Sequence, residues 1–341
     1  MTRVFSGIQP SGEMQLGNYV GAVRRWVDGQ PAAGSAEAAS HSSIHCVVDL
    51  HAMTVGYDPA TLRQRTREVA TLLFAAGLDP ARSVVFVQSQ VAAHTEGTWI
   101  LECVATYGEL RRMTQFKEKS EGQDSSTAGL LVYPVLMAAD VLLYDTDEVP
   151  VGDDQRQHVE LTRDLAIRFN HRFGDTFVVP KATFPKIGAR IMDLQTPTNK
   201  MSKSAASPQG TVLVLDRPEV IAKKLKSAVT DSGSEIRYDT EEKPGVSNLL
   251  DLYAVATGAT RDDAVDHFAG SGYGALKTTV ADAIVEFLRP VRERYDELAR
   301  DPGEVDRLLA QGAGIAEAIA GGVLERVRAA CGLIPRVIRP V

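Results

Sequence analysis

The sequence predicts an α/β fold, in which a parallel sheet covered by helices is followed by an all-helical region. Short apolar runs at 4–8, 44–51 and 83–88 alternate with segments whose apolar residues recur at helical spacing. Continuous apolar strands that alternate with helices are typical of a parallel sheet buried on both faces. Beyond residue 204 only helical patterns follow. We therefore expect a Rossmann-like parallel-sheet domain with a C-terminal all-helical domain.

Size and composition limit the class of protein. A chain of 341 residues suggests two domains, or one large domain with an appendage, and 44% hydrophobic with 24% charged residues is ordinary for a soluble protein. The N-terminus lacks the apolar core of a signal peptide. The longest apolar run, 130–144, is interrupted by Pro134 and Asp140, so no segment reaches the ~18 residues of a membrane span. We expect a cytoplasmic protein with no membrane partner.

The cysteines and the net charge carry further expectations. Cys46, Cys103 and Cys331 are far apart and show no metal-binding spacing, so we expect buried reduced thiols and no structural metal. A net charge of −7 argues against general affinity for nucleic acid. Nucleic-acid binding would therefore require a local basic face.

The N-terminal strand, Val4–Ile8, ends at a turn that contains Pro10, Ser11 and Gly12 and precedes a predicted helix at 16–27. Strand, Gly-rich turn and helix place free N–H groups and the positive end of a helix dipole where an anion can bind. Packing alone also makes many such turns rich in glycine. A nucleotide site and a packing turn are both open at this point.

The remaining elements follow from apolar spacing. Helices are expected at 59–76, from 152–155 to about 169, at 220–229, at 276–298 with a kink at Pro290, and at 303–331, weakened by glycines; strands are expected at 149–151 and 177–179, and a loop at 30–43. Ligands of parallel sheets bind at the carboxyl ends of the strands, where Gln9, Asp49, His51 and Gln88 should gather. His51 is either a strand-end side chain with its own partner or a pocket residue.

Asp140 is the single acid of the apolar run 130–144. Such an acid either faces water on one side of a helix or is buried with a partner. Apolar residues flank it on all sides, which favours burial.

The stretch Lys200–Ser204, KMSKS, carries two lysines three residues apart among small hydroxyl residues. Lysine ammonium groups, hydroxyls and backbone N–H groups suit a polyphosphate ligand. A solvated basic turn is the alternative for one short motif.

KMSKS together with the turn PSG-x4-GN at 10–18 resembles the two signature motifs of class I aminoacyl-tRNA synthetases. The short sequence segments at 5–12, 113–119, 151–155 and 188–192 look like the corresponding segments of the bacterial tryptophanyl-tRNA synthetases. This resemblance covers almost the whole chain. It implies ATP-dependent activation of L-tryptophan to tryptophanyl-adenylate and transfer to the 3′ end of tRNA(Trp), with release of AMP and diphosphate. It also implies a homodimer and Mg²⁺ carried with ATP.

The resemblance assigns roles to individual residues. Lys200, Lys203 and Lys119 would stabilise charge on the phosphates. The implied ATP-binding residues are Gln9, Pro10, Ser11, Gly17, Asn18, Gly152, Asp153, Asp154, Ile191, Lys200, Met201, Ser202, Lys203 and Ser204. The implied tryptophan-binding residues are Asp140, Tyr133, Gln155, His51 and Gln9. A buried carboxylate accepts hydrogen bonds only and an indole N–H only donates, so Asp140 suits the substrate indole.

The implied domains are a catalytic domain at 1–204 with a helical connecting insertion at about 99–135, an anticodon-binding domain at 205–300, and a C-terminal helix and tail at 301–341 that could pack back on the catalytic domain. Lys223, Lys224 and Lys226 are the nearest approach to a basic patch, although a solvated helix face explains them equally well. The chain departs from the family pattern at Gln15, commonly Thr or His, and at Leu50, often Gln.

Two other classes of protein share some of these features. Another nucleotidyltransferase would have the strand, turn and lysine loop, but no reason for the helical half or for Asp140 among apolar residues. A non-catalytic relative that binds RNA or a protein would not need both lysines and both serines of the loop, and all four are present.

Overall fold

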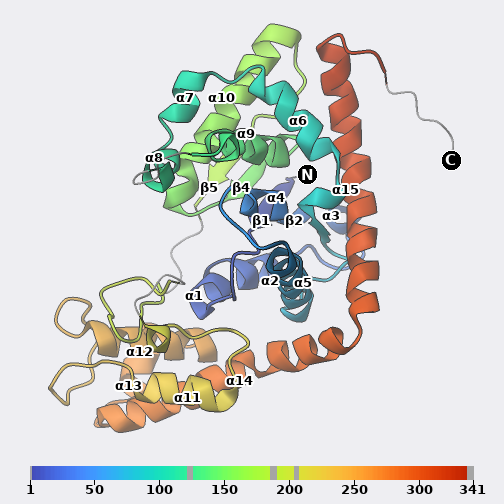
Figure 1. The fold of residues 1–341 in the computed structure, drawn as a ribbon. Coiled ribbons are helices and arrows are strands. Elements are labelled where there is room, and N and C mark those ends of the chain that lie inside the picture. The colour runs from blue at the N-terminus through green and yellow to red at the C-terminus, as the bar shows by residue number, and fades with distance from the viewer. Residues whose placement is uncertain (1, 121–125, 185–189, 203–206, 336–341) are drawn as a thin grey trace.

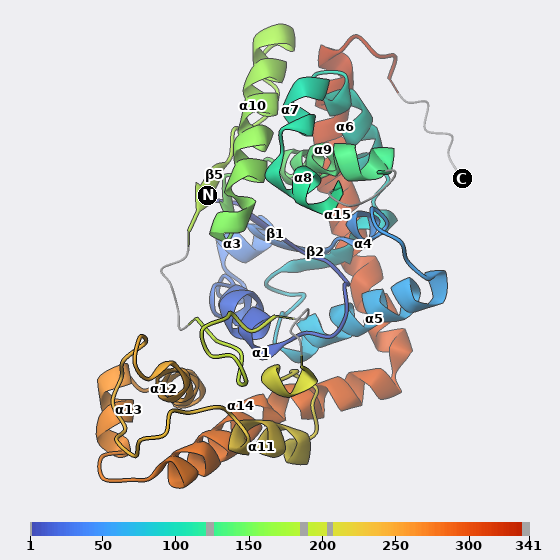
Figure 2. The same ribbon diagram turned by 60° about the vertical axis from the view of Figure 1, so that its left-hand side comes forward.

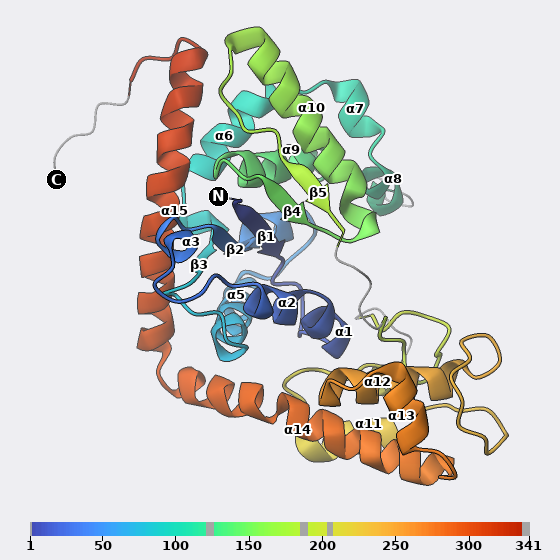
Figure 3. The same ribbon diagram turned by 180° about the vertical axis from the view of Figure 1, so that it is seen from behind.

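The computed structural model describes residues 2–120, 126–184, 190–202 and 207–335. Its centre is a five-stranded sheet with the order β3-β2-β1-β4-β5 (Figure 3). Every pair of neighbouring strands is parallel, which confirms the predicted sheet. The strands are β1 Val4–Ile8, β2 Ser43–Val47, β3 Val84–Val87, β4 Glu148–Pro150 and β5 Lys181–Thr183.

Helices connect and cover the strands. They are α1 Leu16–Asn18, α2 Arg24–Asp28, α3 Ala36–Ala39, α4 Asp49–Ala52, α5 Pro59–Ala75, α6 Ala93–Glu102, α7 Tyr107–Arg111, α8 Thr114–Ser120, α9 Ala128–Leu142, α10 Arg156–Phe173, α11 Pro218–Lys226, α12 Pro244–Thr257, α13 Arg261–His267, α14 Tyr273–Arg300 and α15 Pro302–Ala330. A turn of π-helix at Tyr19–Val23 joins α1 to α2, so the predicted helix at 16–27 is one continuous helical run. No described helix is long and apolar enough to span a membrane.

Three local predictions are wrong. The strand expected at 44–51 ends at Val47 and α4 follows, because Ser89 donates to Asp49 and the Gln88 side chain accepts from the Leu50 N–H. No strand forms at 177–179, since the Asn170 side chain takes the N–H and the carbonyl of Phe177. The strand begins instead at Lys181. The loop expected at 30–43 contains α3.

The sheet separates two apolar cores, because alternate side chains of a strand point to opposite faces. Ile44, Cys46 and Phe86 pack against α6, α9 and α10 on one face. Val47, Val85 and Val87 pack on the other face, where α5 lies. Figure 3 shows these two helical layers above and below the strands.

α15 runs along the outer edge of the sheet beside β3 (Figure 1). Val305 and Leu309 belong to one core, whereas Val323 and Val327 belong to the other, so the helix crosses from one face to the other. At the crossing a Cβ on Gly312 would lie 1.9 Å from the Val85 carbonyl oxygen. The glycines expected to weaken this helix do not interrupt it, and Gly312 permits the close contact that covers an edge strand.

The helices α11 to α14 form a separate layer below the sheet (Figure 1). α14 buries Leu276, Val280, Ile284 and Leu288 against α11 and α12, as its helical spacing predicts. Its C-terminal half lies beside α5 (Figure 2), and Phe287 meets the ring of Tyr19 at 5.9 Å between centroids. α14 therefore connects the helical layer to the sheet domain.

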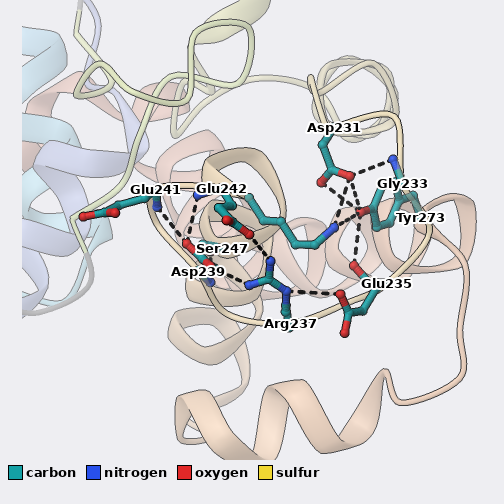
Figure 4. Close-up of polar contacts among 10 residues, drawn as sticks. Asp231, Gly233, Glu235, Arg237, Asp239, Glu241, Glu242, Ser247 and Tyr273 are labelled. Atoms are coloured by element: carbon teal, nitrogen blue, oxygen red, sulfur yellow. Dashed lines mark hydrogen bonds and ion pairs between the residues drawn. The ribbon is translucent and has the colours of Figure 1, made fainter.

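Polar side chains organise the segment between α11 and α12 (Figure 4). Asp231 accepts hydrogen bonds from the Tyr273 hydroxyl at 2.8 Å and from Lys243 Nζ at 3.1 Å. Arg237 pairs with the carboxylates of Glu235, Asp239 and Glu242, and these contacts raise the pKa of its guanidinium. The segment is thus held largely by its own charges.

Candidate active site

Asp140, on α9, is the centre of a buried polar cluster at the carboxyl ends of β2 and β3. Its side chain is 2% exposed, as its apolar neighbours in the sequence predict. It lies 2.6 Å from Gln88 Nε2, 2.6 Å from His94 Nδ1 and 2.7 Å from His51 Nε2. Gln88 follows β3 directly, His51 is on α4, and His94 begins α6. Three chain segments therefore converge on one carboxylate.

The pattern of contacts assigns the protons. Both Gln88 and His94 contact Oδ1, whereas His51 contacts Oδ2. A carboxylate only accepts, so His94 donates to it from Nδ1, and the opposite ring nitrogen, Nε2, lies 2.8 Å from the Tyr144 hydroxyl. Each carboxylate oxygen has about two acceptor positions. Oδ1 is therefore filled, and Oδ2 keeps one position for a further donor.

The charge state of Asp140 follows from the same contacts. Burial raises the pKa of the Asp140 carboxyl, but attraction and hydrogen bonds from His51 and His94 outweigh burial and hold the pKa below its usual range. Asp140 is therefore ionised at neutral pH. A buried anion with an open acceptor position suits a ligand that brings an N–H donor into an apolar site.

Of these partners, the sequence reasoning placed Gln88 and His51 at the strand ends but missed His94. His94 is separated from Asp140 by 46 residues. Its local signal is weak, because it is the second residue of a helix that mixes apolar and polar residues. The pairing with Asp140 therefore leaves no pattern in the sequence.

Tyr133 lies on one side of the Asp140 cluster. Its ring meets His51 edge to face, with 6.1 Å between centroids. Its hydroxyl donates to Gln115 Oε1 at 3.1 Å and lies 2.9 Å from His158 Nε2. Burial, with the negative charge of Glu118, raises the pKa of Tyr133 to about 12, so the hydroxyl stays protonated. Gln155 precedes His158 by one helical turn and donates to Asp154.

The two signature segments lie side by side. Leu16 N–H donates to the Val212 carbonyl at 2.8 Å, and Val214 N–H donates to the Met14 carbonyl at 2.9 Å. Gln15 Nε2 donates to the Met201 carbonyl at 2.9 Å. The N-terminal turn and the start of the lysine loop, 186 residues apart in the chain, therefore meet.

The other predicted site residues differ in exposure. Gln9, Ser11, Asn18, Gly152, Asp154 and Lys200 are exposed, Gly17 and Ser202 are half-buried, and Pro10, Ile191 and Met201 are buried. Lys203 and Ser204 lie outside the described residues. Lys119 falls in α8 and Asp153 at the head of α10, and their side chains are also outside the described part of the structure.

The predicted environments of three side chains, those of Lys224, Cys103 and Cys331, need correction. Lys224 is not part of a surface basic patch: it is 7% exposed and donates to Asp216 at 2.7 Å and to the Thr211 carbonyl at 2.8 Å. Cys103 is exposed and Cys331 is half-buried, so of the three thiols only Cys46 is buried as expected. Leu50, the departure beside the strand end, lines an apolar pocket with Met53 and Tyr133.

Comparisons with known proteins show the family of the chain. Residues 1–289 match the family model described as class I tRNA synthetases (W and Y). The chain is 51% identical over 336 residues to the tryptophan–tRNA ligase of Caldanaerobacter subterraneus subsp. tengcongensis, covering 98% of this chain and 100% of that protein. It is 52% identical over 343 residues to tryptophan–tRNA ligase 1 of Streptomyces coelicolor, covering 99% of each.

Two solved structures are similar over almost their whole length. The tryptophanyl-tRNA synthetase of Mycoplasma pneumoniae superposes with a TM-score of 0.84 at 34% identity, covering 98% of each chain. That of Campylobacter jejuni, complexed with ADP and tryptophan, has a TM-score of 0.82 at 33% identity and covers 97% of this chain and 100% of its own. By sequence and by fold, this chain belongs to the class I aminoacyl-tRNA synthetases, in the family of the bacterial tryptophanyl-tRNA synthetases.

Proposed function

We propose that the chain activates L-tryptophan with ATP and transfers it to the 3′ end of tRNA(Trp), with release of AMP and diphosphate. The observation that carries the substrate assignment is Asp140 Oδ2, which keeps one acceptor position within a buried cluster. The indole N–H of tryptophan would fill that position. His51 would line the pocket, Tyr133 and Gln155 would meet the α-ammonium group of the substrate, and Gln9 would also contact tryptophan.

The first step needs no protein nucleophile. An oxygen of the tryptophan carboxylate attacks the α-phosphorus of ATP, the bond from that phosphorus to the bridging oxygen breaks, and diphosphate leaves with Mg²⁺ that entered with ATP. The protein must align the two substrates and stabilise the charge that moves to diphosphate. Lys200, Lys203 and Lys119 would supply positive charge there. Gln9 to Ser11, Gly17, Asn18, Gly152 to Asp154 and the loop from Ile191 to Ser204 would form the ATP site.

In the second step a hydroxyl of the terminal tRNA ribose attacks the carbonyl carbon of the adenylate, and AMP leaves. We propose that the helices α11 to α14 bind the tRNA at its anticodon. With Lys224 buried, Lys223 and Lys226 are the lysines that α11 presents to solvent. A tRNA ligand also makes the cytoplasm the expected location.

We further propose a homodimer built on α6 and α9. Trp99 is 66% exposed on α6, one helical turn from Thr95. Thr95, with Val132 and Leu136 of α9, lines the outer part of the same apolar pocket that Leu50 lines. A two-fold interface brings the same patch of both copies together. A protruding indole beside an apolar hollow is self-complementary in this way. Trp99→Glu should yield monomers in sedimentation velocity, whereas unchanged dimers would exclude this face.

Exchange of labelled diphosphate into ATP tests the function directly. We expect exchange that depends on tryptophan, with tyrosine and phenylalanine at least ~10³-fold less effective, because a site built around a buried acceptor rejects ligands that lack the donor. Aminoacylation of tRNA(Trp) tests the second step. Exchange that prefers tyrosine, or a folded protein that gives no exchange with any amino acid, would overturn the proposal.

A further inference from the structure

Gln15 uses all the hydrogen-bonding capacity of its amide nitrogen within the protein. It is 2% exposed. Its Nε2 donates to the Met201 carbonyl at 2.9 Å and to Asn18 Oδ1 at 3.2 Å, and its Oε1 accepts from the Gly17 N–H at 2.7 Å. An amide nitrogen has two hydrogens, so neither is left for a phosphate oxygen. Gln15, which departs from the family pattern at this position, therefore has a local structural role.

The segment that Gln15 contacts carries one of the candidate catalytic lysines. Met201 is buried, its N–H donates to the Ile191 carbonyl at 3.1 Å, and the Thr211 hydroxyl donates to the Ser202 carbonyl at 3.1 Å. Lys200 precedes this anchored stretch and is exposed. Fixing the main chain on the buried side thus restricts where the Lys200 ammonium group can lie.

The same segment is held from the helical layer by a different side chain. Asn248 of α12 accepts from the Met192 N–H at 2.9 Å and donates to the Met192 carbonyl at 3.0 Å. Met192 in turn pairs with Lys200 as an antiparallel bridge. Asn248 therefore ties this hairpin-like segment to the helical layer, whereas Gln15 ties it to the N-terminal turn.

We propose that Gln15 is a positioning residue that docks the Lys200–Ser202 segment on the N-terminal turn. The carbonyl of Met201 and the amide of Gln15 form a buried donor–acceptor pair, and breaking such a pair costs more than an exposed bond because neither group reaches water. The docked segment presents Lys200 to the ATP site in one arrangement. Gln15 acts through this segment and does not itself contact phosphate. The kinetic consequence rests on the proposed function, whereas the docking itself does not.

Limited trypsin digestion tests docking without any substrate. Cleavage requires the chain around the bond to leave its packed conformation, so loss of the Gln15 bond should speed cleavage after Lys200. In Gln15→Met we expect this rate to rise about fivefold, which corresponds to ~1 kcal/mol for one hydrogen bond. Gln30→Met is the matched control, because Gln30 is also buried and its Nε2 donates to the Gly77 carbonyl at 3.0 Å, in another part of the sheet domain. This control should leave cleavage after Lys200 unchanged.

Gln15→Glu separates docking from the contact with Gly17. At pH 8 a glutamate keeps an oxygen that accepts from the Gly17 N–H but has no hydrogen for the Met201 carbonyl. We expect cleavage after Lys200 as fast as in Gln15→Met, together with a fivefold lower kcat of diphosphate exchange and an unchanged KM for tryptophan. Unchanged cleavage in both variants, with only the KM for ATP raised, would make Gln15 a direct phosphate ligand and overturn the proposal. If wild-type protein shows no exchange, the digestion result still decides whether Gln15 docks the segment.

Discussion

His94 Nδ1 lies 2.6 Å from Asp140 Oδ1, and the opposite ring nitrogen of His94 lies 2.8 Å from the Tyr144 hydroxyl. The imidazole is fully buried between them. It holds one carboxylate oxygen of Asp140 in place and leaves the other oxygen, next to His51, with an open acceptor position. Under the proposed function, the indole N–H of tryptophan would therefore meet Oδ2.

Asp140→Asn should remove the acceptor for the indole while preserving the cluster. The asparagine oxygen can keep the bonds from Gln88 and His94, and its amide can donate to His51 in the other tautomer. We expect kcat/KM for tryptophan to fall at least ~10²-fold and the preference over phenylalanine to narrow by a similar factor. Diphosphate exchange with both amino acids measures this. A full tryptophan preference in the folded variant would mean that another group recognises the indole.

Lys203→Ala should affect the transition state of adenylate formation, although Lys203 itself lies outside the described residues. Loss of one charge-assisted contact to departing diphosphate is expected to cost about 3–4 kcal/mol of barrier, or ~10²–10³ in kcat, with little change in tryptophan affinity. Single-turnover adenylate formation gives the rate. The control is Lys181→Ala, because Lys181 is exposed at the start of β5, and this variant should react at the wild-type rate. A normal kcat in Lys203→Ala would remove Lys203 from the mechanism.

His45 should make the protein less stable in mild acid. It is buried on β2 and stacks on Trp26 at 5.0 Å, and its Nδ1 has no hydrogen-bond partner among the described residues. Burial lowers its pKa to about 3. The unfolded chain, with a histidine pKa of about 6.5, therefore binds a proton that the folded chain does not. The contribution of neutral His45 to stability is therefore complete above pH ~6.5 and is lost as the pH falls toward 3.

His45→Phe keeps the aromatic contact with Trp26 and removes the titration. Between pH 6.5 and 5 the wild-type protein should lose about 1.6 kcal/mol more unfolding free energy than the variant, because the unfolded-state histidine goes from half to fully protonated over this range. Urea denaturation at the two pH values measures the difference. Equal losses in both proteins would show that His45 takes up its proton without unfolding.

Gly312→Ala should loosen α15 from the sheet. The new Cβ would lie 1.9 Å from the Val85 carbonyl oxygen, so helix or strand must move. We expect a loss of about 1–3 kcal/mol in unfolding free energy. Gly314→Ala is the matched control, because in the described part of the structure no atom beyond its chain neighbours and its own helix backbone lies within 4 Å of its Cβ position. Alanine there should stabilise the helix by ~1 kcal/mol. Thermal unfolding should move in opposite directions for the two variants.

Local sequence patterns determined much of this fold. Apolar continuity predicted β1 and β3 within one residue at each end, and apolar spacing predicted α5, α14 and α15, because hydrophobic periodicity is a property of neighbouring residues. The motifs at 10–18 and 200–204 indicated the family, and the apolar surroundings of Asp140 predicted its burial. These features depend on a few consecutive positions, and a sequence displays them directly.

Only the tertiary structure decided which residues meet. His94 and Gln88 reach Asp140 across 46 and 52 residues, Gln15 reaches Met201 across 186, and Gly312 meets the Val85 backbone where α15 crosses the sheet edge. The early end of β2 and the start of β5 likewise follow from hydrogen bonds made by Gln88 and Asn170 side chains. Such contacts depend on how distant segments are packed, because a hydrogen bond is set by the position of its two atoms in space and leaves no periodic pattern along the chain.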